Sequence, residues 1–212
     1  MTRLVYLYVH DTMADWEPAY LLPELATGRF FKDPDQRYQT RLCGRTTDPV
    51  ITMGGICLIP EMRINNIEPA PGRVLILPGS NTWLDPVHDQ VLEKVRDFLG
   101  TEMIIGAICG ATMGLARTGF LNNRPHTSND LAVLKNFCPG YTGDIYYVSK
   151  PAVTDGNLIT ASGFSAVDFA YEVMKKMGVM RKTTLEAWYN LNLYKKPEYY
   201  YQLMESLKEF GK

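Results

Sequence analysis

Three short, almost uninterrupted apolar runs constrain the fold of this chain more than any other feature. They lie at residues 4–9, 74–77 and 103–108. Runs of this length are typical of strands that are covered on both faces, as the strands of a parallel sheet are. Each run is followed by a turn and by residues with helical periodicity. The sequence therefore predicts an α/β fold, a mostly parallel sheet with helices on both faces.

The remaining pattern fills in this arrangement and suggests how the chain is divided. Helices are predicted at residues 16–25, 87–99, 110–117, 130–137 and 166–177, and shorter strands at 39–43, 50–52, 56–59, 146–148 and 158–160. A chain of 212 residues can bury one sizeable core. We predict one domain over residues 1–180, with a Tyr-rich helical appendage, residues 181–212, packed on it. The aromatic side chains of this appendage either cap the sheet or form a dimer interface.

Composition argues against several classes of protein. The 22 basic and 23 acidic residues give a net charge of −1, so there is no electrostatic reason to expect nucleic acid or an anionic membrane as a partner. No apolar run approaches the ~20 residues of a membrane span. No dinucleotide or P-loop motif is present, and we expect neither a cofactor nor a metal. The partner expected is a small molecule.

The four cysteines at positions 43, 57, 109 and 138 are widely spaced. They form no CxxC pair, which argues against a disulfide framework or a structural zinc site. The apolar N-terminal run has no small-residue cleavage site after it, so it is interpreted as a strand rather than a signal peptide. Free thiols without an export signal predict a cytoplasmic protein.

Cys109 stands at the most informative junction of the chain. An apolar strand ends at Ile108, and the small residues Gly110 and Ala111 begin a helix at once. Such a sharp turn lifts the cysteine side chain above the carboxyl ends of the strands, where open α/β sheets bind ligands. The helix N-terminus offers N–H groups and partial positive charge, which are expected to lower the pKa of the thiol. The alternative is that Cys109 is a small core residue.

Four segments, taken in order, resemble the ThiJ/PfpI family of the class I glutamine amidotransferase-like superfamily. They are YVHDTMADWEPA, LILPGS, AICGAT and GFLNNRPHTSND. The resemblance spans about residues 4 to 175 and implies a flavodoxin-like three-layer sandwich with a nucleophile elbow, usually as a homodimer. Members of that family include amidases, chaperone-like proteins, glyoxal-detoxifying enzymes and oxidative-stress sensors.

The resemblance also implies roles for individual residues. Cys109 matches the elbow nucleophile, and Glu17 matches a carboxyl group that faces it. Gly79 matches a loop whose N–H, together with that of Gly110, would form an oxyanion hole. Without the resemblance, Glu17 is equally well a carboxylate in the first turn of a helix, and Gly79 a glycine in a turn that ends a strand.

The histidines depart from the family's pattern. Protease-like members carry a histidine directly after the cysteine, where this chain has Gly110. Other members end a Thr-Ser-His triplet with a histidine, where this chain has Asn129. His126 is the remaining candidate base, although in an extended segment positions 126 and 129 point to opposite sides. His10 follows the first strand at the correct edge of the sheet, and His88 is interpreted as a surface residue.

Because a positioned histidine is absent, the sequence favours thiol chemistry over peptide hydrolysis. Three hypotheses stay open. The protein is a cysteine-dependent enzyme that acts on a small amide, aldehyde or other electrophile. Alternatively, it responds to oxidative stress through oxidation of Cys109. The third hypothesis is a binding protein that keeps the pocket but has no turnover.

Overall fold

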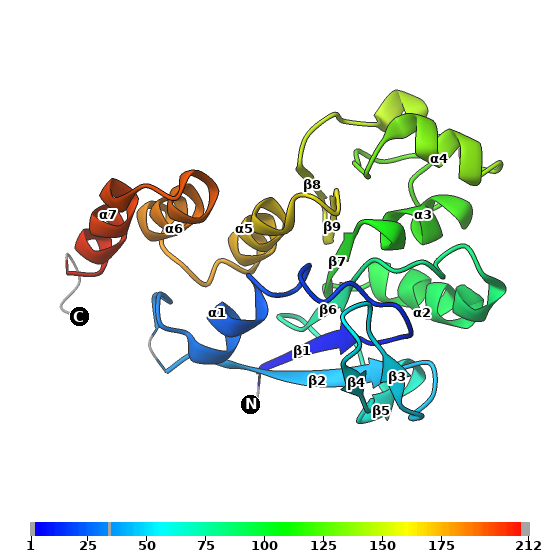
Figure 1. Cartoon of the computed structure of the whole chain (residues 1–212), viewed down its shortest axis with the longest axis horizontal. Helices are drawn as coiled ribbons and strands as arrows, with labels where there is room; N and C mark the ends of the chain where they lie inside the picture. The colour runs from blue at the N-terminus through cyan, green and yellow to red at the C-terminus, as the bar shows by residue number, and fades with distance from the viewer. Residues whose placement is uncertain (1–2, 34, 209–212) are drawn as a thin grey trace.

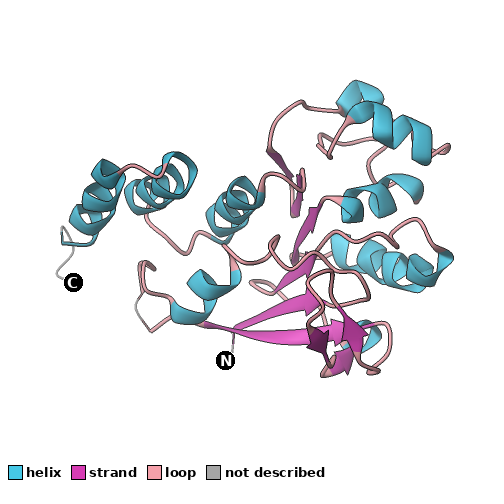
Figure 2. Cartoon of the chain, viewed as in Figure 1, coloured by secondary structure: helices cyan, strands magenta, loops and turns pink. Residues whose placement is uncertain are grey.

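The computed structural model describes residues 3–33 and 35–208 and shows three layers (Figure 1). A seven-stranded sheet in the order β5-β2-β1-β6-β7-β9-β8 lies between two layers of helices (Figure 2). Neighbouring strands of this sheet run parallel, except that β8 is antiparallel to β9. The predicted α/β, flavodoxin-like fold is confirmed.

The sheet and its helices have the following bounds. The strands are β1 (Arg3–Tyr8), β2 (Tyr38–Gly44), β5 (Met62–Arg63), β6 (Val74–Leu77), β7 (Ile104–Ile108), β8 (Ala152–Asp155) and β9 (Leu158–Ala161). A separate hairpin pairs β3 (Val50–Ile51) with β4 (Cys57–Leu58). The α-helices are α1 (Leu22–Thr27), α2 (Asp89–Leu99), α3 (Gly110–Arg117), α4 (Leu131–Phe137), α5 (Ala166–Met177), α6 (Lys182–Tyr194) and α7 (Pro197–Lys208).

Each face of the sheet carries its own apolar core. On one face, Leu25 of α1 and Phe169 of α5 pack on side chains of the central strands. On the other face, Val91 of α2 and Leu115 of α3 do the same. The four residues of β6 and the five of β7 are all buried. This burial on both sides explains why those strands are apolar at every position rather than at alternate ones.

The helix predicted at residues 16–25 is wrong in its first half. Residues 15–21 form turns, and α1 begins only at Leu22. Pro18 disfavours helical backbone at the residue before it. Pro23 fits the first turn of α1, where its missing N–H removes no hydrogen bond. Glu17 therefore lies in an irregular loop and not in the first turn of a helix.

Two short strands near the C-terminal edge also differ from the prediction. The strand predicted at residues 146–148 is absent: Asp144–Tyr146 is a 3₁₀ turn, and a single bridge joins His126 to Tyr147. The edge strand β8 was missed. It forms a hairpin with β9 around Gly156, a Gly turn signal that the prediction did not use.

The C-terminal residues form two helices that contact the rest of the chain. Leu185 and Trp188 of α6 and Leu203 of α7 are buried in the apolar cluster on the α5 face. The indole N–H of Trp188 donates to Glu24 of α1 over 3.0 Å. Tyr194, Tyr200 and Tyr201 are exposed. Part of the appendage therefore packs as core, and part of its aromatic surface stays uncovered. In residues 3–33 and 35–208, no helix is both long and apolar enough to cross a membrane.

Candidate active site

The strand order brings four loops together at the carboxyl edge of the sheet. Strands β1, β6, β7 and β9 are neighbours in that order. The residues that follow them carry Glu17, Gly79, Cys109 and Gly163 respectively. The prediction that a site forms at this edge depends on this order, because only adjacent parallel strands place their following loops side by side.

Cys109 occupies the turn between β7 and α3 with strained backbone. Its φ of 58° and ψ of −125° lie in a region that non-glycine residues rarely adopt. Such a conformation costs of the order of 1–3 kcal/mol and is retained only where the surroundings impose it. Here the Cys109 N–H is bonded to the Ala161 carbonyl of β9, over 3.0 Å. The result is a half-buried sulfur at the start of α3.

Glu17 is fully buried beside this sulfur. Its Oε2 accepts a hydrogen bond from the Gly79 N–H over 2.5 Å. Its Oε1 faces the Cys109 thiol and has no hydrogen bond of acceptable geometry among the described residues. Burying a negative charge on an oxygen without a hydrogen-bond donor is unfavourable, so this environment favours the protonated form of the carboxyl group. The structure thus pairs Glu17 with Cys109, as the resemblance implied.

Two glycines form the walls of this site. A Cβ on Gly163 would lie 2.6 Å from Cys109 Sγ, and one on Gly79 would lie 2.9 Å from the same atom and 2.9 Å from Glu17 Oε1. Real Cβ atoms do not approach other heavy atoms so closely. Glycine at both positions therefore lets the backbone close around the sulfur and the carboxyl group.

Asn129 stands at the position where the resemblance implied a histidine. Its amide Nδ2 donates to Cys109 Sγ over 3.3 Å, and its Oδ1 accepts from the Gly163 N–H over 2.8 Å. The side chain thus fixes the loop after β9 and directs a donor at the sulfur. An amide donates a hydrogen bond, but it cannot accept and return a proton as an imidazole does.

Burial raises the pKa of both acids at the site. Burial raises the pKa of Glu17 to about 7, against the smaller lowering effect of the Gly79 and Cys109 hydrogen-bonding groups. Burial and the Glu17 carboxylate raise the pKa of Cys109, while donation from Asn129 and from the Gly110 N–H lowers it. The expectation that the helix N-terminus makes the thiol acidic is therefore wrong in net direction. The pair shares its protons, and its titration belongs to both groups.

The predicted oxyanion hole needs a correction. The Gly79 N–H is engaged by Glu17 and is not directed at open space. The Gly110 N–H is at the sulfur and stabilises the thiolate. Gly79 and Gly110 thus border the site as predicted, but Gly79 holds the carboxyl group and does not provide a vacant donor.

His126 does not serve the cysteine. Its Nδ1 is bonded to the Arg124 carbonyl over 2.8 Å and its Nε2 to the Tyr141 hydroxyl over 2.7 Å. Both ring nitrogens are thus occupied away from Cys109, as the alternation of an extended segment predicts. The candidacy of His126 as the base is overturned.

The other two histidines are both buried. The interpretation of His88 as a surface residue is wrong, because its ring is bonded to Tyr8 and Thr82. The 3₁₀ turn Pro86–His88 departs from the α-helical period, so that Val87 is exposed and His88 faces inward. His10 lies at the correct edge of the sheet, but Trp83 packs between its ring and the elbow.

Sequence reasoning missed two members of the site, Asn129 and Gly163. The signal for Asn129 was present, since it stands at the family's histidine position and a carboxamide can donate to sulfur. The signal for Gly163 was a glycine soon after a buried strand. Among the described residues, no group of three or more His, Cys, Asp or Glu side chains is arranged to hold a metal ion.

Known proteins of one family are similar to this chain over nearly its whole length. The profile of the DJ-1/PfpI family matches residues 3–176. The chain is 45% identical over 206 residues to the uncharacterized protease YoaZ of Bacillus subtilis (strain 168), covering 97% of this chain and 98% of that protein.

Solved structures give the same result. A ThiJ/PfpI family protein from Bacillus anthracis superimposes with a TM-score of 0.93 at 43% identity, over 97% of each chain. The DJ-1 superfamily protein Atu0886 from Agrobacterium tumefaciens superimposes with a TM-score of 0.77 at 28% identity, over 92% of this chain and 99% of that one.

Proposed function

This chain belongs to the DJ-1/PfpI family, and from that premise we propose that it is a reactive-cysteine protein whose Cys109 thiol combines with small electrophiles and oxidants. The observation that carries the proposal is the buried Glu17 carboxyl, whose Oε1 faces the sulfur without another hydrogen bond. Burial raises the pKa of this carboxyl to about 7, so near neutral pH the carboxylate can accept the thiol proton and the resulting acid can return a proton to a group bound at the sulfur.

The geometry supports two related reactions. With hydrogen peroxide, the thiolate sulfur attacks one oxygen, an S–O bond forms and the O–O bond breaks. The departing hydroxide takes the Glu17 proton and leaves as water, and the sulfur is oxidised to a sulfenic acid. With a small aldehyde, an S–C bond forms, the carbonyl electrons move to oxygen, and Glu17 protonates that oxygen. The carboxylate left in either case regains its proton from solvent.

Glu17 and Asn129 are also suited to hold an oxidised cysteine. A protonated Glu17 donates to a sulfinate oxygen, and the Asn129 amide provides a second donor on the side of Gly163. Hydrogen bonds to an ionised acceptor are stronger than those between neutral groups. These donors favour a product that persists long enough to act as a stress signal.

We expect graded peroxide to convert Cys109 to sulfinic acid before the other three cysteines react. Cys43 and Cys138 are buried and their thiols donate to the backbone carbonyls of Leu7 and Met113, whereas Cys109 is only half-buried. Cys57 is exposed, and it has no such donors among the residues that the structure describes. In Glu17→Leu, the yield of Cys109 sulfinic acid should fall roughly tenfold, the effect of one hydrogen bond to a charged group. Peptide mass spectrometry measures all four sites.

Cys57→Ser is the matched control for this experiment, because it removes the exposed competitor and leaves the site intact. It should oxidise at Cys109 as the wild type does. Earlier oxidation of Cys57 than of Cys109, or an unchanged sulfinic acid yield in Glu17→Leu, would contradict the proposal.

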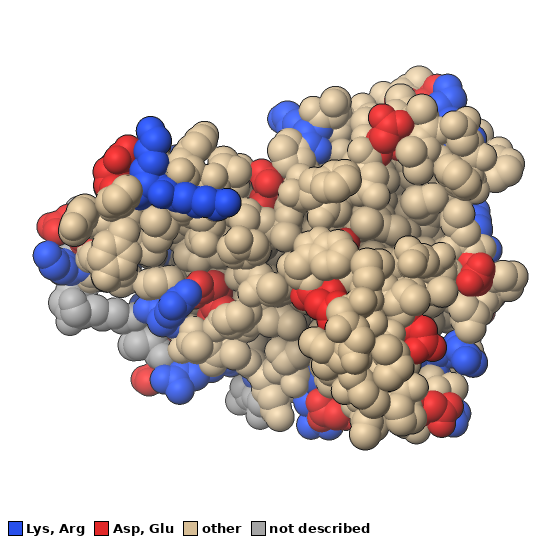
Figure 3. All heavy atoms as spheres, viewed as in Figure 1, with Lys and Arg blue, Asp and Glu red and all other residues tan. Residues whose placement is uncertain are grey.

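We further propose that the protein is a homodimer in the cytoplasm. Ile51, Met53 and Ile56 on the β3–β4 hairpin are exposed large apolar residues, and the hairpin is bonded to the loop that carries Glu17. Exposed apolar groups of this kind mark contact surfaces. The face seen in Figure 3 shows acidic and basic side chains scattered around broad uncharged areas. The cysteines are free thiols, which suits a reducing compartment.

We expect Ile56→Glu to shift the protein from dimer to monomer, because it buries a charge in the contact. Tyr201→Glu, on the exposed part of α7, is the matched control and should leave the dimer intact. Light scattering after size-exclusion chromatography measures the mass directly. Dissociation by Tyr201→Glu alone would place the interface on the C-terminal helices instead.

A further inference from the structure

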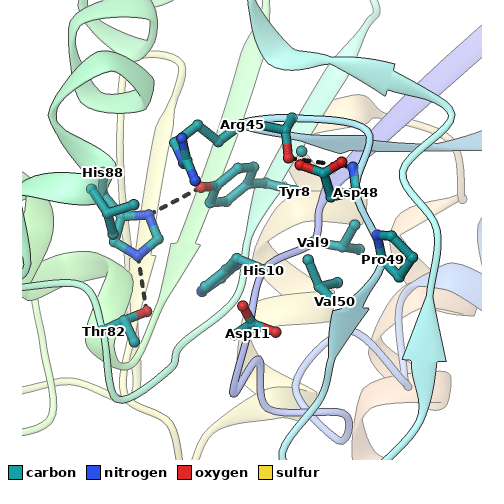
Figure 4. Close-up of a pocket in the computed structure, with 13 residues that line it drawn as sticks. Tyr8, Val9, His10, Asp11, Arg45, Asp48, Pro49, Val50, Thr82 and His88 are labelled. Atoms are coloured by element: carbon teal, nitrogen blue, oxygen red, sulfur yellow. Dashed lines mark hydrogen bonds between the residues drawn. The ribbon is translucent and has the colours of Figure 1, made fainter.

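A cavity opens at the same edge of the sheet (Figure 4). Trp83 packs between its residue His10 and the helix that follows Cys109. The indole of Trp83 packs against the elbow helix at Gly114 and stacks on His88 on its other side, with ring centroids 4.6 Å apart. The cavity measures about 290 Å³. Its charged lining residues are Asp11, Arg45 and Asp48. Polar residues beside them include Tyr8, His10, Thr82 and His88, and no residue of the site at Cys109 lines the cavity.

His10 is the feature that points to a ligand. Its side chain lines the cavity and the residue is only 6% exposed, yet neither Nδ1 nor Nε2 makes a hydrogen bond of acceptable geometry among the described residues. The ring is held in place by stacking on Tyr8, with centroids 4.8 Å apart. Burial lowers the pKa of His10 to about 3. The Tyr8 backbone carbonyl beside the ring raises this pKa by a smaller amount. The imidazole is therefore neutral, with one N–H donor and one bare nitrogen acceptor.

The neighbouring groups of the floor are already bonded to one another. The Tyr8 hydroxyl is bonded to His88 Nδ1 over 3.0 Å, and His88 Nε2 to the Thr82 hydroxyl over 2.9 Å. These two hydrogen bonds fix the wall of the cavity and occupy both nitrogens of His88. Of the two histidines in this floor, His10 is thus the one whose ring nitrogens can still bond to a ligand. Buried polar groups are ordinarily hydrogen-bonded, so an unbonded one indicates a missing partner.

Arg45 supplies the charge that reaches this floor. In Figure 4 its side chain lies over the Tyr8 hydroxyl. Of the charged residues in the lining, Arg45 alone shifts the pKa values of Tyr8 and His88, lowering both. Asp11 is held at the rim, where its Oδ1 accepts from the Ile51 N–H over 2.9 Å. Asp48, the other acidic residue of the lining, lies on the side of Tyr8 away from His88 in Figure 4. The part of the floor beneath Arg45 therefore favours an anionic group.

We propose that this cavity binds a small hydroxy acid, with its carboxylate on the Arg45 guanidinium and its hydroxyl on the bare His10 nitrogen. The volume equals that of roughly ten liquid water molecules, which suits a ligand of a few heavy atoms. An arginine guanidinium recognises a carboxylate through charge-assisted hydrogen bonds. The site is separate from the cysteine chemistry.

The test uses the full chain labelled with ¹⁵N-histidine and titrated with glycolate at constant ionic strength. The chain has three histidines. We expect the ring signals of His10 and His88 to shift saturably, with a Kd of the order of 1 mM for so small a ligand. His126 lies outside the cavity and should not shift. Glycolamide, which has the same shape without the charge, should bind at least about tenfold more weakly.

Variants separate this site from the rest of the molecule. Arg45→Gln should raise the Kd for glycolate at least about tenfold. Arg41→Gln, which removes an arginine that pairs with Glu61 outside the cavity, should leave it unchanged. Cys109→Ala should bind as the wild type does. Arg45 is exposed, so Arg45→Gln is expected to fold. It therefore tests binding even if a variant in the floor, such as His10→Phe, fails to fold.

Three results would overturn the proposal. One is equal binding of glycolate and glycolamide. Another is an unchanged Kd in Arg45→Gln. The third is loss of the histidine shifts in Cys109→Ala, which would assign glycolate to the cysteine site. Absence of any shift up to 50-fold above the expected Kd would show that the cavity holds no such ligand.

Discussion

Replacing Gly163 with alanine is expected to lower the alkylation rate of Cys109 by about 100-fold or more. The new Cβ would lie 2.6 Å from Cys109 Sγ and 2.8 Å from its Cβ. The cysteine cannot turn aside easily, because its backbone is held at the strained elbow by β9 and α3. Displacing a reacting atom by about 1 Å is enough to cost a factor of the order of 100.

The measurement is the rate of iodoacetamide modification at Cys109, read by mass spectrometry beside a thermal unfolding curve. Gly140→Ala is the matched control, since a Cβ there meets nothing within 4 Å. Gly79→Ala should act as Gly163→Ala does, because its Cβ would press on both Cys109 and Glu17. A folded Gly163→Ala protein with the wild-type alkylation rate would show that the sulfur is not confined as the structure indicates.

Peptide hydrolysis is expected to be negligible, in contrast to reaction with a small α-oxoaldehyde. A positioned general base or acid typically contributes ~10²–10⁴ in rate. Here the residue after the cysteine is Gly110, and the amide of Asn129 stands at the sulfur. Expelling an amine also requires a proton for the leaving nitrogen. Addition of a thiolate to an aldehyde needs one proton on oxygen, which Glu17 can provide.

The comparison is between the wild type, Cys109→Ala and His126→Ala, on a panel of peptides and on methylglyoxal. Loss of methylglyoxal consumption in Cys109→Ala and its retention in His126→Ala are expected, because both nitrogens of His126 are bonded elsewhere. Peptide turnover that depends on Cys109 and is lost in His126→Ala would restore the histidine as the base.

The stoichiometry of the same reaction separates the hypotheses about function. Consumption of many equivalents of methylglyoxal per chain would indicate an enzyme. Consumption of a single equivalent, with a stable adduct on Cys109, would indicate a protein that senses or binds electrophiles without turnover. Cys109 and Glu17 carry the chemistry in both cases, so the distinction rests on whether the adduct is released.

The sequence by itself determined the central strands and the elbow, because both are encoded locally. Strands β6 and β7 are apolar at every position since both of their faces are covered. The change from an apolar strand to small residues at Gly110 predicted the turn that presents Cys109. The resemblance of four segments to a known family added Glu17 as the partner of the cysteine, and the structure brings the two together.

Only the tertiary structure decided how the other residues contribute. Gly163 borders the sulfur because β9 lies beside β7, and strand order is not written in the local pattern of either strand. His88 is buried because it meets Tyr8, which lies 80 positions earlier in the chain. The same contact closes the floor around His10. Hydrogen-bond partners and burial arise from packing between distant segments, so local periodicity cannot show which buried polar group stays unsatisfied.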